Sequence, residues 1–201
     1  MTILLLAILL GLVYSEFVGY WLHRLLHSEK IPSLSKDHMI HHLKLYSPKG
    51  SMRSETYRKA TGERFSVGNI GIEWLAPLAV VIGATIAFMT VLSISVLSQF
   101  LFLGSAILWG IFGFSYIHDG LHVSNFWMLN NRFINTWFKK IRRLHDIHHT
   151  RITNDGKMHV NFGMCFFILD RIFGTKAEVT GRFNDAGYEE AKKRYSFINK
   201  E

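Results

Sequence analysis

The stretch HDIHH, residues 145–149, places three histidines in five positions, and HMIHH, residues 38–42, repeats nearly the same pattern. Two further histidine pairs occur at HRLLH, residues 23–27, and at HDGLH, residues 118–122. A random distribution of the 11 histidines over 201 residues would place about one in these four windows. The windows contain all of them except His159, so the clustering needs an explanation beyond composition.

Length and composition limit what the clusters can be. A chain of 201 residues forms one domain, or one membrane unit with a soluble cap. The only cysteine, Cys165, excludes an internal disulfide and an iron–sulfur cluster, which needs about four thiolates. A hydrophobic content of 49%, concentrated in long uncharged stretches, is unlike that of an ordinary soluble domain.

Two such stretches predict helices that cross a membrane. Residues 3–22 carry one charge, Glu16, and a helix of that length extends about 30 Å, which matches the hydrocarbon core of a bilayer. Residues 65–117 carry one charge, Glu73, and are too long for a single span. We therefore expect three spans, at about residues 3–22, 71–92 and 99–117, with a tight turn within residues 93–99.

The first apolar stretch could instead be a cleaved signal peptide, because it is apolar and contains a small residue, Ser15, near its end. No basic residue precedes it, however, and it continues unbroken to His23. These features favour a retained span.

Three spans place residues 23–69 and 118–201 on the same side of the membrane. These two segments carry 9 and 14 basic residues, which together are all 23 lysines and arginines of the chain. The positive-inside rule then puts both segments, and with them every histidine, on the cytoplasmic face of a multi-pass membrane protein. The net charge of +8 thus has an explanation that requires no nucleic acid.

The spacing of the histidines is typical of metal ligands. Residues at i, i+3 and i+4 share one face of a helix, so each window presents at least two imidazoles together. Imidazole binds zinc, copper, iron and nickel. One zinc uses about four ligands, so ten histidines are too many for one site and suit two metals with about five each. The sequence therefore predicts an all-α integral membrane protein, a single domain over residues 1–201, whose histidine-rich cytoplasmic cap holds a dinuclear metal site.

Other classes of protein fit less well. A single histidine at a helix end often has only a structural role, but four clusters on one membrane face have no structural reason to exist. A zinc peptidase needs a glutamate directly after the first histidine, where this chain has Arg24 and Asp119. A metal transporter places its ligands near the middle of the bilayer, whereas these histidines lie at or beyond the span ends. A histidine-rich membrane protein for metal binding or transport remains the alternative from another class.

The four histidine windows, in this order, resemble those of the membrane-bound fatty acid hydroxylase superfamily, which includes fatty acyl hydroxylases, sterol desaturases and carotene hydroxylases. The segment HVNFGMCFFILDRIFGT, residues 159–175, is similar to the segment that follows the last window in that family. The resemblance covers roughly residues 10–176.

The resemblance implies a non-haem centre of two iron ions, with zinc as a possible substitute, that uses O2 to hydroxylate or desaturate an unactivated C–H position of a lipid. It implies that the metal ligands are His23, His27, His38, His41, His42, His118, His122, His145, His148 and His149. Additional ligands, or partners that orient the imidazoles, are expected among His159, Asp119, Asp146 and Asn161. No catalytic residue is expected beyond these.

Substrate and electron supply are less closely defined. A site roofed by apolar spans implies a lipid, and HRLLH favours a fatty acyl chain or a sterol. A carotenoid hydroxylase of the same superfamily is the alternative, because HDGLH resembles the carotene hydroxylases. Those enzymes usually have four residues between the paired histidines of the first and third windows, where this chain has three. The chain has no dinucleotide-binding fingerprint, so a separate cytochrome b5-like or ferredoxin-like protein is expected to supply electrons to its basic surface.

Two segments after the last histidine window receive simpler predictions. Residues 164–173 are too short to cross a membrane and are expected to form a helix against the membrane or the metal core. The tail from residue 176 is expected to be a solvated helix or disordered.

Overall fold

The computed structural model describes residues 2–60, 66–67, 70–71 and 74–199, and their regular secondary structure is mainly helical, as predicted. The exception is an antiparallel hairpin of two short strands, β1 (Ser66–Val67) and β2 (Ile70–Gly71). The helices, in chain order, are α1 (Thr2–Leu26), α2 (Pro32–Ile40), the π-helix η1 (His41–Leu45), α3 (Leu75–Val91), α4 (Val96–Ile111), the π-helix η3 (Phe112–Ile117), α5 (His118–His122), the 3-10 helix η4 (Trp127–Leu129), α6 (Asn135–Thr150), α7 (Ile168–Ile172), α8 (Asp185–Arg194) and the 3-10 helix η5 (Ser196–Asn199).

Within the described residues, two helical stretches are long and apolar enough to cross a membrane. One is α1, and the other is the continuous run of 27 residues from Val96 to His122 that comprises α4, η3 and α5. Only 22% and 17% of their most apolar windows are buried, which is unlike the core helices of a soluble protein. Both stretches extend beyond the predicted limits at residues 22 and 117, so His23, His118 and His122 belong to the same helices as the apolar residues.

The third predicted span, residues 71–92, corresponds to the shorter helix α3. This helix is apolar but only 17 residues long, and none of its residues is buried. It begins after Trp74, whose indole donates a hydrogen bond to the carbonyl of Leu34 (3.2 Å), and Glu73 falls outside the described residues. The turn to α4 is shorter than expected, because Ser95 already caps α4 by accepting a hydrogen bond from the Ser98 amide (3.3 Å).

Small residues allow α1 and α4 to pack closely. Gly11, Ser15 and Gly19 recur every fourth residue on α1 and are all buried. A Cβ atom at Gly19 would lie 2.0 Å from the ring of Phe114, and one at Gly11 would lie 2.1 Å from the Ser105 hydroxyl. Without a hydrophobic driving force between helices in lipid, such close approach is a main source of helix association. This packing positions the helix that carries the first histidine window relative to the helical run that carries the third.

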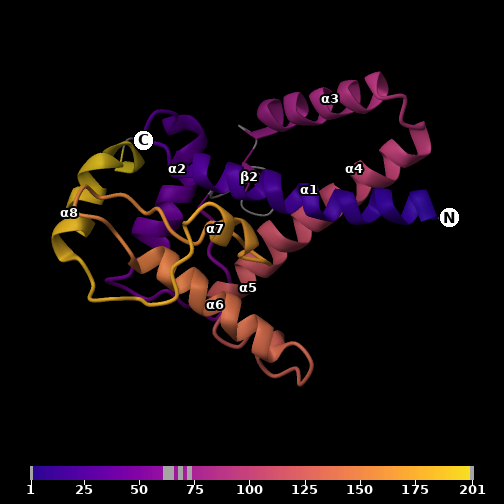
Figure 1. Ribbon diagram of the computed structural model, residues 1–201. Helices are drawn as coiled ribbons and strands as arrows, with labels where there is room; N and C mark the ends of the chain where they lie inside the picture. Colours follow the sequence, from indigo (N-terminus) through magenta and orange to yellow (C-terminus); the bar gives the residue numbers. More distant parts are fainter. Residues whose placement is uncertain (1, 61–65, 68–69, 72–73, 200–201) are drawn as a thin grey trace.

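The remaining helices form a cap at one end of α1 and α4 (Figure 1). In this view α1, α3 and most of α4 project away from the cap, whereas α2 and α8 lie beyond the C-terminal end of α1 and α6 and α7 lie below it. One hydrophobic core of the cap surrounds α6 and includes Phe138, Ile141 and Leu144. Two histidine windows lie at the cap ends of the apolar helices, and the other two lie on the cap helices α2, η1 and α6.

The C-terminal tail is more ordered than the sequence predicts. The helix α8 buries Tyr188 and Ala191, spaced for one helix face, in a second core with Met39 of α2. After α8, Tyr195 is also buried and donates a hydrogen bond to the carbonyl of His27 (2.9 Å). The prediction of a solvated helix or disorder was wrong in this respect, because the polar residues of the tail obscure its apolar face.

Candidate metal centre

The structure divides nine of the ten window histidines between two groups. In each group, one ring nitrogen from every histidine lies within 4.8 Å of the corresponding atoms of the others. The first cluster consists of His23, His27, His38, His42 and His148, and the second cluster of His41, His122, His145 and His149. Residues up to 125 positions apart in the chain thus lie close together in space. The group sizes, five and four histidines, are close to the five ligands predicted for each of two metals.

Each HxxHH window contributes to both clusters, in a crossed arrangement. In HMIHH the outer pair, His38 and His42, joins the first cluster, and the middle histidine joins the second. In HDIHH the outer pair joins the second cluster, and the middle histidine, His148, joins the first. The reason is helical geometry: positions i and i+4 point nearly the same way, whereas i+3 and i+4 differ by about 100° around the axis.

The two clusters adjoin each other. The rings of His42 and His149, one from each cluster, stack with centroids 3.9 Å apart. His41 and His42 lie in the π-helix η1, and a second π-helix, η3, directly precedes His118. Short π-helical segments occur frequently at functional sites. The two histidine clusters are therefore neighbours rather than separate groups.

Within each cluster the Nε2 atoms point toward one another. In the first cluster, the Nε2 atoms of His27 and His148 are 3.1 Å apart, and those of His38 and His27 are 3.0 Å apart. In the second, the Nε2 atoms of His122 and His145 are 2.9 Å apart. Two nitrogens bound to one metal at about 2.1 Å lie about 2.9–3.4 Å apart when the angle between them is about 90–110°. These distances therefore fit a shared cation.

Backbone carbonyls hold several of the rings in the orientation that a metal requires. The Nδ1 atoms of His23 and His148 donate to the carbonyls of Phe162 (2.7 Å) and Val160 (2.6 Å). The Nδ1 atom of His122 donates to the carbonyl of Met52 (2.9 Å). Because a carbonyl can only accept, each Nδ1 carries the proton and each Nε2 keeps its lone pair for a metal.

Burial keeps these imidazoles neutral. It is the largest cause that lowers the pKa of His148 to about 4, and it lowers the pKa of six others well below the ordinary range, namely His27, His38, His41, His42, His145 and His149. Repulsion between neighbouring imidazoles adds to the effect. The buried Nε2 atoms of His23 and His41 have no hydrogen-bond partner within the described part of the chain. Neutral rings with converging, unused lone pairs fit bound metal ions.

The segment after the last window supports the first cluster through Asp170. Its two carboxylate oxygens accept from the backbone amides of Phe162 and Gly163, at 2.7 Å each, and Asp170 is completely buried. The Thr175 hydroxyl also donates to this carboxylate (2.7 Å). Asp170 therefore fixes the segment, residues 160–163, whose carbonyls accept from His23 and His148.

A loop between the second window and the hairpin supports the second cluster. Arg53 donates through Nη1 to the Met52 carbonyl (2.9 Å), the same oxygen that accepts from His122. Its Nη2 atom donates to both carboxylate oxygens of Asp146 (2.5 and 2.6 Å). Asp146 was expected to orient an imidazole directly; the structure places it against Arg53, one residue off the histidine face of α6.

The other predicted site residues lie around the clusters rather than in them. His118 is buried with its ring centroid 4.7 Å from that of His41, and its Nδ1 atom is 3.4 Å from the Asp119 carboxylate. Asn161 is completely buried, and its side chain binds backbone groups of Leu144 and Ala177. His159 is exposed and belongs to neither cluster.

Sequence reasoning missed the groups that orient the rings. The carbonyls of Met52, Val160 and Phe162 belong to residues with apolar side chains, so no side-chain pattern reveals them. Arg53 stands in a loop with no motif, and its role depends on contact with Asp146, 93 positions away. Only the Asp170 contact has a visible signal, the Asp-Arg pair within residues 159–175.

Comparison with known proteins agrees with this geometry. The family model "Fatty acid hydroxylase" matches residues 8–175, a region that contains all four histidine windows and the segment that carries Asp170. No curated protein and no solved structure matches the chain. Since the match covers most of the chain and both clusters, the protein belongs to the fatty acid hydroxylase family, whose members are membrane-bound oxidoreductases of lipids.

Proposed function

We propose that this protein is a membrane-bound di-iron oxygenase that hydroxylates or desaturates an unactivated C–H position of a lipid, either a fatty acyl chain or a sterol. The observation that carries the proposal is the pair of adjoining, buried clusters of converging imidazole nitrogens. Family membership supports the lipid as substrate. A transporter would need ligands along a path through the bilayer, and these clusters lie at the ends of the apolar helices.

In this proposal one iron is held by the first cluster and the other by the second. When bound, the iron pair would supply the activation of O2 that oxidation of such a C–H bond requires. The residues of the chain supply orientation and enclosure: carbonyls fix the rings of His23, His122 and His148, and the clusters lie in a buried interior. An imidazole donor set suits iron, and zinc as its substitute.

The membrane arrangement proposed is a multi-pass protein with three spans and its cap in the cytoplasm. Two of the spans are α1 and the run from Val96 to His122. The third is α3, which is about 26 Å long at 17 residues and exposes apolar side chains such as Val80 and Phe88 along its length. Because the clusters lie at the cap ends of α1 and α5, a lipid substrate would reach them from the bilayer side.

The metal content of detergent-purified protein, produced with iron supplied, tests the proposal first. About two metals per folded chain are expected, and with iron bound the protein should consume O2 when a reduced donor and lipid are present. Two zinc ions would retain the paired site and reopen the identity of the native metal. One metal or none in folded protein would contradict the di-iron proposal.

Electrons are proposed to come from a separate, acidic donor protein of the cytochrome b5-like or ferredoxin-like kind. The basic residues Lys139, Lys140 and Arg143 are exposed on α6, the helix that carries the HDIHH window. If complementary charge steers the donor, added salt should slow the reduction step. A rate of reduction that is independent of ionic strength would argue against such a donor.

Replacement of Arg53 by glutamine is expected to weaken metal binding at the second cluster. The change removes the ion pair with Asp146 and the contact that holds the Met52 carbonyl against His122. Loss of a group that orients a ligand typically lowers metal affinity by about 10–100-fold. Competition between the purified protein and a chelator for the metal measures the metal affinity. Arg132→Gln, on an exposed residue that contacts Phe133 and not the clusters, is the matched control and should leave it unchanged.

A further inference from the structure

The short helix α7 has an exposure pattern opposite to that of a surface helix in a soluble protein. Its acidic residue Asp170 is completely buried, whereas Ile168 and Ile172 are 63% and 67% exposed. The flanking aromatic residues Phe166 and Phe173 are also exposed, at 47% and 43%. A contiguous exposed surface of large apolar side chains marks a site where another apolar surface binds.

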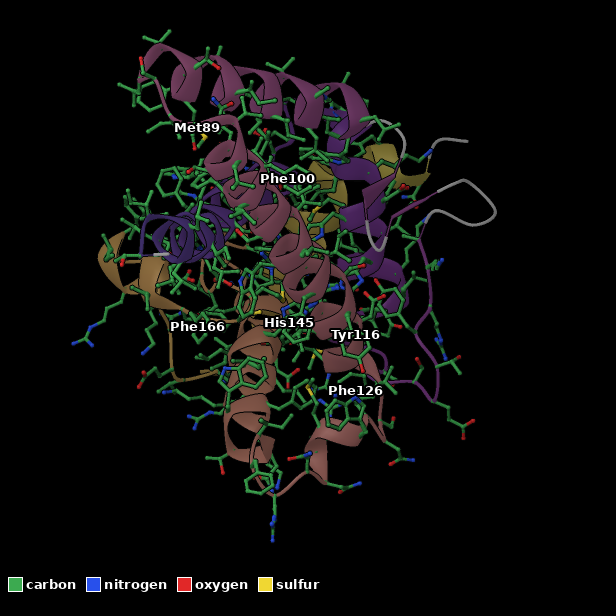
Figure 2. All side chains as sticks on the ribbon, turned by 90° about the vertical axis from the view of Figure 1, so that its right-hand side faces the viewer. Met89, Phe100, Tyr116, Phe126, His145 and Phe166 are labelled. Atoms are coloured by element: carbon green, nitrogen blue, oxygen red, sulfur yellow. The ribbon has the colours of Figure 1, made fainter. Side chains whose placement is uncertain are left out.

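This apolar face is continuous with the exposed side of α1. The ring of Phe173 packs against Trp21, with centroids 5.3 Å apart, and Trp21 is itself 41% exposed. At the other end, the ring of Phe166 stacks on Trp109 of α4, with centroids 6.0 Å apart and planes nearly parallel. Figure 1 shows α7 at the place where α1 and α4 enter the cap, and in Figure 2 Phe166 and Tyr116 lie on either side of His145.

We propose that α7 lies in the bilayer interface, with Phe166, Ile168, Ile172 and Phe173 in contact with lipid. The proposal goes beyond the catalytic function and rests on one part of it, the crossing of the membrane by α1. Lipid is the occupant that fits, because the patch extends the apolar belt of α1 rather than standing apart from it. The cap therefore sits partly embedded in the membrane rather than above it.

Charged residues beside the patch fit the headgroup region. Arg24 is exposed one turn beyond Trp21, and its guanidinium lies 5.0 Å from the centre of that ring. Arg171, also exposed, lies on α7 between the two isoleucines. Basic and aromatic side chains at the ends of apolar surfaces are typical of the boundary between membrane and water.

Lipid contact at α7 would act directly on the metal centre. The inner side of the helix carries Asp170, which binds the backbone amides of Phe162 and Gly163. The carbonyls of this segment accept from His23 and His148. The membrane therefore supports the outer side of the element that orients two imidazoles of the first cluster.

Spin labelling of full-length protein in vesicles of phosphatidylcholine and phosphatidylglycerol tests the proposal. Single cysteines are introduced by Ile168→Cys and Ile172→Cys, by Val13→Cys on the exposed side of α1, and by Ser196→Cys on the exposed surface of the tail. The unaltered chain gives the background, because its one cysteine, Cys165, is buried and burial raises the pKa of its thiol. Collision rates of each label with O2, which concentrates in lipid, and with a water-soluble nickel chelate are measured.

We expect the ratio of O2 to chelate collisions at residues 168 and 172 to shift from the water value of Ser196 toward the lipid value of Val13. Water-like ratios at 168 and 172 beside a lipid-like ratio at Val13 would overturn the proposal for α7 and leave the span intact. Low collision rates with both reagents at 168 and 172 would overturn it in favour of protein contact, such as a second copy of the chain. A water-like ratio at Val13 would overturn the span and with it the proposal.

Discussion

Replacement of His148 by alanine is expected to abolish turnover and to empty the first cluster of metal, while the chain remains inserted in the membrane. His148 is completely buried, its Nδ1 is held by the Val160 carbonyl, and its Nε2 lies 3.1 Å from that of His27. Loss of a group that merely orients a ligand lowers metal affinity by about 10–100-fold, so loss of the ligand itself should exceed about 100-fold. Metal analysis and O2 consumption of the purified variant measure both effects.

His41→Ala tests the second cluster in the same way, and His159→Ala is the matched control. His41 has a buried Nε2 atom without a hydrogen-bond partner among the described residues, which leaves its lone pair available to a metal. We expect His41→Ala to lose the metal of the second cluster and all turnover. His159 is exposed and outside both clusters, so its replacement should change neither metal content nor rate. Activity retained by both cluster variants would rule out the ligand assignment.

Replacement of Asp170 by alanine should produce the second largest effect, in stability as well as in metal binding. The carboxylate satisfies the buried amides of Phe162 and Gly163 and the hydroxyl of Thr175. Each buried donor left without an acceptor costs about 1–3 kcal/mol, so loss of the two amide contacts should lower the free energy of unfolding by about 2–6 kcal/mol. Thermal unfolding in detergent, followed together with metal content, measures the change.

Two variants separate the role of Asp170 from a general effect of losing a carboxylate. Asp170→Asn keeps the shape and one acceptor oxygen, so it should fall between the unaltered chain and Asp170→Ala. Asp185→Ala removes an exposed carboxylate that pairs with Lys49 at the surface and should change the stability by less than about 0.5 kcal/mol. Equal stability of Asp170→Ala and Asp185→Ala would contradict the proposed support of residues 160–163.

The helical fold and the clustering of the window histidines could be predicted because they depend on local patterns, whereas the assignment of these histidines as metal ligands stays a prediction. Apolar stretches predicted α1 and the run that ends at His122, although α3 proved shorter than the predicted span. The spacing of the windows predicted imidazoles on shared helix faces, and nine of the ten lie in the two clusters. His118 belongs to neither cluster, and its ring lies next to that of His41 in the second cluster.

The supporting contacts could not be predicted, because they join distant segments. Asp146 stands inside the HDIHH window, which suggested a contact with an imidazole. One residue changes the direction of a helical side chain by about 100°, so Asp146 points away from the clusters and meets Arg53 instead. The buried face of α8 was missed for a similar reason. Its apolar residues are buried only because they pack against distant residues such as Met39 of α2.

The sequence by itself determined a histidine-rich helical protein with apolar helices long enough for a membrane, because composition and helical period act over a few turns of chain. The tertiary structure alone decided how the imidazoles divide between two clusters and which carbonyls orient them. Those outcomes depend on how α1, α2, α5 and α6 approach one another, and that approach is set by contacts such as Gly19 with Phe114 across the chain. The spacing of residues determines which side chains share a helix face, but the packing of the helices determines which residues that face contacts.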